Sequence, residues 1–389
     1  MKILHLMLSC FYIDSYSYQE NLLPKYHKKM GLDVEIIASL FTFDKDGKGI
    51  WLENEKRYVN EYGIPVTRLC FKHFPMAKKL RIYDKFKETL EKSNPDIIFM
   101  HGISFWDANV IVQYKKEHPN IKIYADNHTD FGNSAKNWLS KNILHKMVWR
   151  YCAKKLEPLV EEFYGVLPAR VNFLTDVYKV KKDKVKLLVM GADDDAIVQT
   201  VSEDGRVKIR EKFKIGCGDI LLMTAGKIDC NKPQVMNLMR AVRNMNRNDV
   251  KLVVFGVVDP ALKQQFEENI DGDRVIYAGW LKAEDTYRYF DSADLLVFPG
   301  LHSVYWEQAV GCGCACLFNR ILGFTHIDLG GNCEFIEDNS TDGIRKKLEE
   351  ILKYPDRINA MREKAQEEGK KVFRYSQIAK TSIGEDKIG

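Results

Sequence analysis

The chain has 389 residues, of which 45% are hydrophobic and 29% are charged. This composition is typical of a globular protein with about two domains and excludes a largely disordered chain. No run of about 18 apolar residues occurs, which argues against a membrane-spanning helix. The opening MKILHLMLSC fits a first β-strand better than a signal peptide, because no small-residue cleavage site follows it.

The positive charge is concentrated in the N-terminal half. Up to Met190 the chain has 31 Lys and Arg against 22 Asp and Glu, whereas the whole chain has a net charge of +5. A basic half indicates an anionic partner, either nucleic acid or an anionic membrane surface. A lysine-rich surface with no partner is an equally good interpretation.

Apolar runs alternate with helical patterns along the first half. The expected elements are a strand at 2–9, a helix at 16–31, a strand at 33–40, and three helix–strand repeats within 83–102, 107–128 and 163–180. The alternation predicts parallel strands covered by helices.

The second half starts the pattern again. We expect strands at 218–228, 250–257, 274–281, 294–300 and 314–318, with helices at 234–245, 260–270, 283–293 and around Glu307, and a helical tail at 341–372. Two such patterns predict two doubly wound α/β domains. We assign residues 1–195 to an N-terminal domain and 196–369 to a C-terminal domain, and we expect a helix within 370–389 to pack back on the first.

Nine cysteines occur, and none forms a CxxC pair. Cys312, Cys314 and Cys316 alternate, which would place them on one face of an extended strand. No second cluster completes a thiolate site, so we predict small buried residues and no metal. Unpaired thiols fit a reducing cytoplasm.

Glycines end several strands of the second half, at the edge where open α/β sheets bind ligands. Gly226 and Gly256 would let the backbone approach a ligand closely. Lys227 and Lys232 could neutralise a diphosphate, helped by helix N-terminal amides, although surface lysines without a ligand are also common. The spacing matches neither a P-loop nor GxGxxG.

Glu307 stands at an expected helix start in HSVYWEQAVGCGCACLF. An acid there would face the ligand-binding edge, while the following glycines would let its helix pack close to the sheet. The alternative is a carboxylate that only interacts with the helix dipole, which is worth about 0.3–1 kcal/mol.

The ordered series AGKIDCNK, VFGVVD, YAGWL, SADLLVFPG and WEQAVGCGCACLF resembles the retaining glycosyltransferases of family 4. The resemblance extends from the first strand to about Glu337. It implies the GT-B fold, an α/β architecture of two facing Rossmann-like domains with a central cleft.

The resemblance also implies roles for individual donor-side residues. Lys227 and Lys232 match the positions that bind the nucleotide diphosphate, and Glu307 matches the glutamate that holds the ribose hydroxyls. Pro299 stands where the family has an earlier glutamate. The loop residues His302, Ser303 and Val304 take the place of the segment that grips the donor sugar.

The N-terminal half supplies the candidates for the acceptor side and the catalytic candidate His128. His128 follows a strand in YADNHTDFGNS and matches a cleft-facing histidine of the family, with Asp126 beside it and His101 as a second candidate. A histidine there could equally be a satisfied polar residue. The candidates that replace the family's Gly-Gly loop are Tyr16, Tyr18 and Gln19.

Two basic segments carry apolar side chains at helical spacing, FPMAKKLRIYDKFKETL and KNWLSKNILHKMVWRYCAKKLEP. Basic amphipathic helices bind anionic membranes, but a packed helix with a solvated basic face gives the same pattern.

The resemblance implies a retaining glycosyltransferase that moves a sugar from a nucleotide-sugar, UDP- or GDP-linked, to a hydroxyl of a glycan or polyprenyl-linked acceptor. No DxD-type motif follows a suitable strand, so we expect a metal-independent reaction without a cofactor. The alternatives are a nucleotide-sugar epimerase of the same fold and a non-catalytic sugar-nucleotide-binding protein. We expect a cytoplasmic protein, with peripheral attachment to the inner membrane face as an open possibility, and no nucleic-acid partner.

Overall fold

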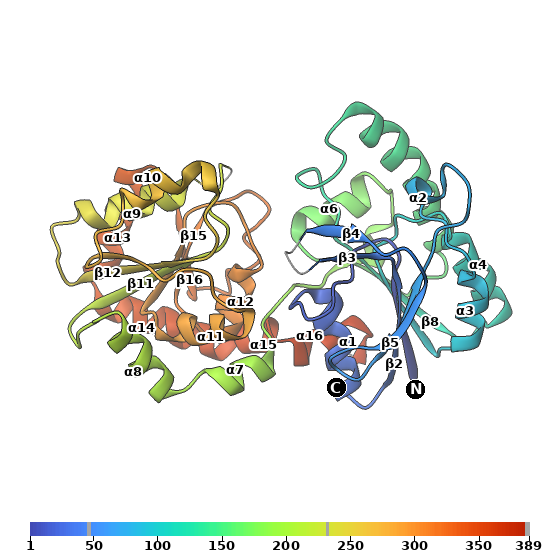
Figure 1. Ribbon diagram of the computed structural model, residues 1–389, viewed down its shortest axis with the longest axis horizontal. Helices are drawn as coiled ribbons and strands as arrows, with labels where there is room; N and C mark the ends of the chain where they lie inside the picture. Colours follow the sequence, from blue (N-terminus) through green and yellow to red (C-terminus); the bar gives the residue numbers. More distant parts are fainter. Residues whose placement is uncertain (45–47, 231–232, 386–389) are drawn as a thin grey trace. The chain divides into compact units, whose positions relative to one another are not determined.

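The computed structural model describes residues 1–44, 48–230 and 233–385. The chain divides into two compact units (Figure 1). Unit 1 consists of Met1–Val189 with Ile378–Gly389, and unit 2 of Met190–Gln377.

Unit 1 is built on an eight-stranded sheet with the order β10-β9-β8-β7-β1-β2-β6-β5. All neighbours are parallel except the edge pair β5–β6. The strands are β1 (Lys2–Met7), β2 (Asp33–Ser39), β5 (Lys56–Val59), β6 (Pro65–Leu69), β7 (Ile97–His101), β8 (Lys122–Asn127), β9 (Glu162–Gly165) and β10 (Val185–Leu187).

Helices cover the sheet of unit 1 on its two faces. They are α1 (Gln19–Lys29), α2 (Ala77–Leu80), α3 (Phe86–Ser93), α4 (Ala108–Glu117), the π-helix η1 (Ser140–Trp149), α5 (Arg150–Leu156), α6 (Pro168–Asp176) and the 3₁₀ turn η2 (Lys182–Lys184). The terminal α16 (Tyr375–Ser382) runs from the end of unit 2 into unit 1.

Strand alternation decides which side chains face which helices. Leu4 and Leu6 of β1 join the core with α3, α4 and α5. Because successive side chains point to opposite faces, His5 faces the other way, where it contacts His27 of α1. Phe99 and His101 of β7 lie on the same face as His5. Polar groups are therefore buried on the face that α1 covers.

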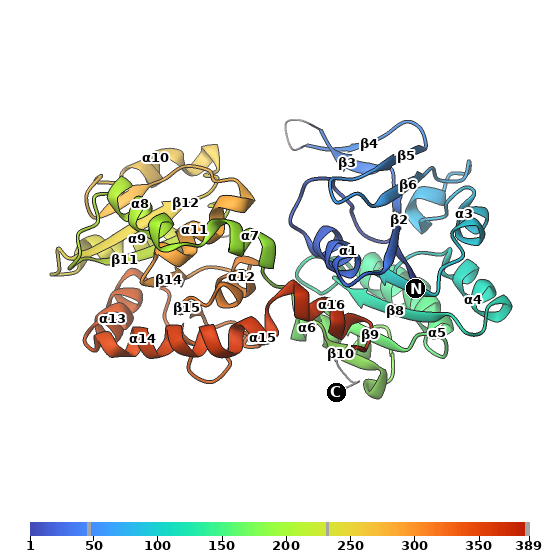
Figure 2. The same cartoon turned by 90° about the horizontal axis from the view of Figure 1, so that it is seen from below.

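The segment between β2 and α3 contains strands that the sequence analysis did not predict. The ribbon of β3 (Phe41–Phe43) and β4 (Gly49–Trp51) is antiparallel and separate from the main sheet (Figure 2). With β5 and β6 it fills the region between residues 40 and 70.

Unit 2 has a six-stranded parallel sheet with the order β13-β12-β11-β14-β15-β16. Its strands are β11 (Ile220–Ala225), β12 (Val250–Phe255), β13 (Val275–Tyr277), β14 (Leu295–Phe298), β15 (Cys316–Asn319) and β16 (Cys333–Ile336). Strand β16 was not predicted.

The helices of unit 2 confirm the predicted helical tail. They are α7 (Asp194–Thr200), α8 (Glu203–Lys212), α9 (Gln234–Asn244), η3 (Pro260–Leu262), α10 (Lys263–Glu267), α11 (Ala283–Ser292), α12 (Tyr305–Cys312), α13 (Thr341–Leu352), α14 (Pro355–Lys364), the π-helix η4 (Ala365–Gly369) and α15 (Lys370–Val372).

Two predictions about the α12 segment were wrong. Cys312 ends the helix and only Cys316 lies in a strand, so the three alternating cysteines do not share a strand face, although all three are buried. The glycines of QAVGCG contact the C-terminal helices and not the sheet. A Cβ on Gly311 would lie 2.3 Å from the carbonyl oxygen of Phe373. These glycines therefore allow α12 to pack against η4 and α15.

Candidate functional site

In both sheets successive strands are added first on one side of the first strand and then on its other side, so the direction of strand addition reverses there. In unit 1 the reversal lies between β1 and β7, and in unit 2 between β11 and β14. Open α/β sheets bind ligands at the carboxyl ends of the strands at such a switch point. The loops that follow these four strands therefore bound the candidate site of each unit.

At the switch point of unit 2, two glycines follow adjacent strands. Gly226 ends β11 and Gly256 ends β12, both with φ +131°, a backbone conformation that strongly favours glycine. A Cβ on Gly256 would lie 1.9 Å from the carbonyl oxygen of Gly226. Beside Gly226 stands the ring of Tyr305, the first residue of α12. The strand ends and the start of α12 thus lie together.

Gly256→Ala is expected to lower the free energy of unfolding by at least about 2 kcal/mol, because the methyl group clashes and the backbone angle is unfavourable. Urea unfolding measures this loss. Gly272→Ala is the matched control, since Gly272 also has positive φ, +76°, but no atom within 4 Å of the added Cβ. Equal losses in the two variants would contradict the role assigned to close packing at Gly256.

Glu307 lies in the first turn of α12 with its side chain fully buried. Its Oε1 lies 2.8 Å from Nε2 of His302 and 2.8 Å from Nε2 of His326. His302 belongs to the loop after β14, and His326 to the loop between β15 and β16. Two imidazoles therefore donate to one oxygen of a single carboxylate.

The two histidines keep Glu307 ionised. Burial alone would raise the pKa of Glu307, but His302 and His326 lower it to about 2. The second oxygen, Oε2, is buried and has no hydrogen-bond partner among the described residues. An ionised oxygen without a partner is an acceptor that a ligand hydroxyl would satisfy.

The other predicted donor-side residues lie around the start of α12 and the end of β11. Val304 is the N-cap of α12 and makes no side-chain cap hydrogen bond, so the first-turn amides have no intrahelical partner. Ser303 accepts a hydrogen bond from the amide of Trp306 through its carbonyl oxygen. Lys227 is exposed, with its Nζ 3.5 Å from Asp229. Lys232 lies outside the described residues.

Four of the predicted acceptor-side residues meet at the switch point of unit 1. Asp126, at the end of β8, is completely buried. Its Oδ2 lies 3.2 Å from Nδ1 of His101 and 3.3 Å from Nε2 of His128, and accepts a hydrogen bond from Nε2 of Gln19 at 3.1 Å. The His128 side chain is 25% exposed, so it is the member of the group that a ligand can reach.

The charges of this group stabilise one another. Burial would raise the pKa of Asp126, but His128 and His101 lower it well below its usual range. Burial would lower the pKa of His128, but the carboxylates of Asp126 and Glu20 raise it overall. The pair is therefore a carboxylate facing an imidazolium over a wider pH range than an isolated histidine allows.

Two further histidines extend the group into the core. His5 lies between His101 and His27, with nitrogen separations of 2.9 and 3.0 Å. His27 Nε2 lies 3.0 Å from the carbonyl oxygen of Ala379 in α16. The row thus runs from Asp126 to the C-terminal helix.

The carbonyl end fixes the proton positions along the row. A carbonyl oxygen only accepts, and the Ser382 hydroxyl, which also lies 3.0 Å from His27 Nε2, gives its own proton to the same Ala379 carbonyl. His27 therefore donates from Nε2, and its neutral ring accepts at Nδ1 from His5. His5 in turn accepts at Nδ1 from Nε2 of His101. Burial lowers the pKa of His5 well below its usual range and that of His27 to about 4, which keeps both rings neutral.

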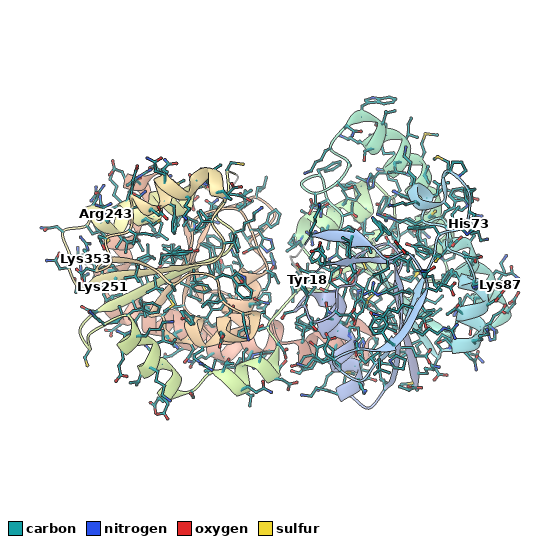
Figure 3. The ribbon with its side chains drawn as sticks, in the orientation of Figure 1. Tyr18, His73, Lys87, Arg243, Lys251 and Lys353 are labelled. Atoms are coloured by element: carbon teal, nitrogen blue, oxygen red, sulfur yellow. The ribbon has the colours of Figure 1, made fainter. Side chains whose placement is uncertain are left out.

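Tyr16 and Tyr18 lie apart from this group. Their rings stack on each other at 5.2 Å, and Tyr18, labelled in Figure 3, is 44% exposed. They form an aromatic surface before α1. Gln19, the next residue, is buried and turned to Asp126.

A basic pocket of about 220 Å³ opens near the end of β1. Lys78, Lys79 and Arg81 line it together with Trp51 and Phe71. The Lys78 ammonium lies 4.1 Å from the Trp51 ring centre. In the part of the chain that the structure describes, no carboxylate pairs with these three cations, so the pocket suits an anionic group.

The sequence alone did not indicate His5, His27, His326 or this pocket. His5 lies within β1 and His27 within α1, where one buried polar residue gives no periodic signal. His326 follows Glu307 by 19 residues, across β15. Its only sequence signal is a histidine in a glycine-rich loop, GFTHIDLGG.

Both clusters consist of residue types that bind divalent metals. The ligand-type atoms of His302, Glu307 and His326 lie within 4.8 Å of one another, as do those of His101, Asp126 and His128. Around Glu307 the 2.8 Å separations are those of N–H groups donating to a carboxylate, so hydrogen bonds account for that geometry.

The match to a known protein family lies within one of the two units. Residues 219–354, within unit 2, match the family model of the group 1 glycosyl transferases. This region contains the glycine ends of β11 and β12, Glu307 and both of its histidines. A search of curated protein sequences finds no match.

Solved structures are similar over the whole chain. A glycosyltransferase from Rickettsia africae has a TM-score of 0.68 at 15% identity, covering 100% of this chain and 98% of that one. HepE from Anabaena, solved with UDP, has a TM-score of 0.68 at 13% identity and 100% coverage of both. A UDP-N-acetylglucosamine 2-epimerase has a TM-score of 0.60 at 12% identity, covering 99% and 95%.

These neighbours confirm the predicted fold class, GT-B, with two Rossmann-like α/β units. At sequence identities of 12–15%, the structural similarity shows only that the fold is shared. The family match covers the strand ends and α12 of unit 2. Together they support a glycosyltransferase of GT-B fold.

Proposed function

We propose that the chain is a retaining, metal-independent glycosyltransferase of family 4 that binds a UDP- or GDP-sugar in unit 2. The observation that supports it best is Glu307, a buried carboxylate with one oxygen held by two histidines and the other without a partner. Two adjacent ribose hydroxyls would donate to that second oxygen. The proposal takes further support from HepE, which was solved with UDP-glucose as well as with UDP.

The remaining described donor residues lie near the same position. The first-turn amides of α12 and the ammonium group of Lys227 would face the diphosphate and stabilise the charge that grows on it. We assign the same role to Lys232, which lies outside the described residues. Gly226 leaves room for the nucleotide beside the end of β11, and Gly256 allows the Gly226 backbone to pack there. We assign the loop of His302, Ser303 and Val304 to the sugar.

In the proposed reaction the bond between the sugar anomeric carbon and the diphosphate oxygen breaks, and a bond to the acceptor hydroxyl oxygen forms on the same face. The proton of the acceptor hydroxyl passes to the oxygen of the departing diphosphate, and the nucleoside diphosphate leaves. The sugar carries developing positive charge in the transition state, as in glycoside hydrolysis. We assign His128, with Asp126 and His101 behind it, to contact the sugar or the acceptor, and Tyr16, Tyr18 and Gln19 to the acceptor side.

The acceptor is a glycan or a lipid-linked glycan. The pocket of Lys78, Lys79 and Arg81 in unit 1 favours an acceptor with a phosphate group, because its three cations have no carboxylate partner among the described residues. A polyprenyl-linked acceptor has such a group, and the proposed setting is the cytoplasmic side of the membrane.

Thermal unfolding with UDP, GDP and their sugar conjugates is the first test, since a bound donor raises the melting temperature. We expect one nucleotide to stabilise the protein and its sugar conjugate to stabilise it more. Release of nucleoside diphosphate should then depend on acceptor, persist in EDTA, and give a product with the donor's anomeric configuration by NMR. Inversion of the anomer or loss of turnover in EDTA would contradict the retaining or the metal-independent part.

An epimerase is the second candidate, because a protein with that activity shares the fold. It predicts isomerised nucleotide-sugar without acceptor, which the same NMR experiment detects. Tight donor binding with neither transfer nor isomerisation would favour the non-catalytic alternative.

A further inference from the structure

The segment between β8 and β9 places a row of apolar side chains in solvent. Here η1 continues directly into α5. Along them Leu139, Ile143, Met147 and Tyr151 are 64, 44, 64 and 46% exposed, and Trp138 is 69% exposed. These helices form the projecting part of unit 1 beyond α2 and α6 in Figure 1.

The spacing explains why these side chains share one face. In a π-helix the hydrogen bonds run from residue i to i+5, so each turn is wider than the 3.6 residues of an α-helix, and positions four apart stay aligned. The opposite face carries His145, Trp149, Cys152 and Leu156, which are buried in the core of unit 1. Core packing is thus provided by the second row, and the first row lies at the surface, where Tyr151 stacks on Trp106 at 5.7 Å.

Basic side chains are interspersed with and flank the exposed apolar row. From Phe131 to Leu156 the chain has six Lys and Arg and no Asp or Glu. They are Lys136, Lys141, Lys146, Arg150, Lys154 and Lys155, of which Lys154 pairs with Glu157, the first acid after this segment. Phe131 itself is 51% exposed, with the Lys141 ammonium 4.9 Å from its ring centre.

A second segment of the same character lies against the first. Residues 71–83 contain four Lys and Arg and no acid, and expose Phe74 and Met76 to 43 and 45%. The Arg81 guanidinium lies 5.8 Å from the Trp149 ring centre, which joins this segment to η1. His73, labelled in Figure 3, lies at the surface of unit 1 within it. We call the two segments together the basic ridge.

We propose that the basic ridge docks unit 1 on an anionic lipid bilayer. Trp and Tyr with Leu, Ile and Met suit the boundary between headgroups and acyl chains, while the surrounding lysines are attracted to anionic lipids. A second copy of the chain is a poor partner, because two ridges would bring like charges together. None of the helices in the described ranges has the length and apolarity to cross a bilayer, so docking is peripheral.

This inference is independent of the proposed function, since it concerns only the surface of unit 1. It also agrees with it: the pocket of Lys78, Lys79 and Arg81 belongs partly to the ridge, so a docked protein would hold that pocket near the lipid headgroups.

The test is co-sedimentation of the full chain with vesicles of phosphatidylcholine alone or mixed with phosphatidylglycerol. We expect binding only to the anionic vesicles, with a decrease between about 0.1 M and about 0.5 M salt. Trp138→Ser with Leu139→Ser should lower the partition coefficient at least about tenfold, because two large side chains no longer enter the interface. Lys136→Glu with Lys141→Glu should lower it by a similar factor, with the loss largest at low salt.

Matched controls come from unit 2. Trp280 is 66% and Leu322 is 99% exposed, so Trp280→Ser with Leu322→Ser removes the same side chains from another surface. This variant should bind vesicles as the parent chain does. Equal binding to neutral vesicles, or equal losses in both double variants, would overturn the proposal. So would a concentration-dependent dimer in light scattering that the Trp138 and Leu139 changes abolish, because the ridge would then be an interface between copies.

Discussion

Glu307→Gln is expected to weaken binding of the nucleoside diphosphate by about ten- to a hundredfold. The amide keeps the size of the side chain but removes the charge that ribose hydroxyls would meet, and hydrogen bonds to a charged group contribute about 1.5–3 kcal/mol. Isothermal titration calorimetry with UDP and with GDP measures the change. Glu337→Gln is the control, since Glu337 is a 67% exposed glutamate of the same unit.

The same substitution is expected to destabilise unit 2. Lowering of the Glu307 pKa to about 2 corresponds to about 3 kcal/mol of folding free energy at neutral pH. Because the folded-state pKa is depressed, this contribution is present above the usual carboxyl pKa and is lost as the pH falls toward about 2. Urea unfolding should therefore show a fall on the acid side in the parent chain that is smaller in Glu307→Gln.

His302→Gln separates binding from stability. It replaces one of the two imidazole donors to Oε1 by a neutral amide but leaves the carboxylate with its partnerless oxygen. We expect a smaller loss of stability and nearly unchanged nucleotide affinity. If Glu307→Gln lowers stability but binds UDP and GDP as the parent chain does, Glu307 is a structural residue and the donor site lies elsewhere.

The sequence predicted the central strands of both sheets because they are buried on two faces and appear as continuous apolar runs. It missed β3, β4 and β5, which are short and mostly exposed, with sequences such as KRYV that resemble loops. Cys312 was misplaced because the small residues of VGCGC continue the helix to its glycine cap instead of starting the strand. The local sequence does not show where α12 ends. The tertiary contact of Gly311 with Phe373 is consistent with a helix that extends to Cys312.

The candidate sites were predictable where residues follow a strand. Asp126, His101 and His128 were found in this way, and the structure brings their side chains together. The partners that complete each group come from other elements. His326 reaches Glu307 across a strand, and His27 reaches His5 from a helix. Such pairings depend on the tertiary fold, and one sequence carries no spacing rule for them.

Asp126→Asn is expected to lower the free energy of unfolding by about 3–5 kcal/mol at neutral pH, because it removes one member of a buried, paired set of charges. The carboxylate lies 3.2 and 3.3 Å from nitrogens of His101 and His128, and the amide cannot balance their charge. Urea unfolding measures the loss. Asp33→Asn, at an exposed position in β2, should change stability by no more than about 0.5 kcal/mol.

The stability that Asp126 and His128 contribute depends on pH. The pKa of His128 is raised in the folded state, so its contribution to stability is complete below the usual histidine pKa and is lost as the pH rises through the raised value. Asp126 has a lowered pKa, so its contribution is present above the usual carboxyl pKa and is lost toward acid. The charges that act on His128 are Asp126 from β8, Glu20 from α1 and the opposing Arg170 from α6. The parent chain should therefore be most stable between these limits, and the variant should lose that maximum.

NMR of the histidine ring nitrogens distinguishes this charge network from simple packing. In the parent chain His5 and His27 should carry a proton only on Nε2, as the row that ends at Ala379 requires. In Asp126→Asn the pKa of His128 should fall, because the carboxylate that raises it is gone. An unchanged His128 titration would show that Asp126 does not set the charge of His128, and a proton on Nδ1 of His5 or His27 would show that the row is ordered in another way.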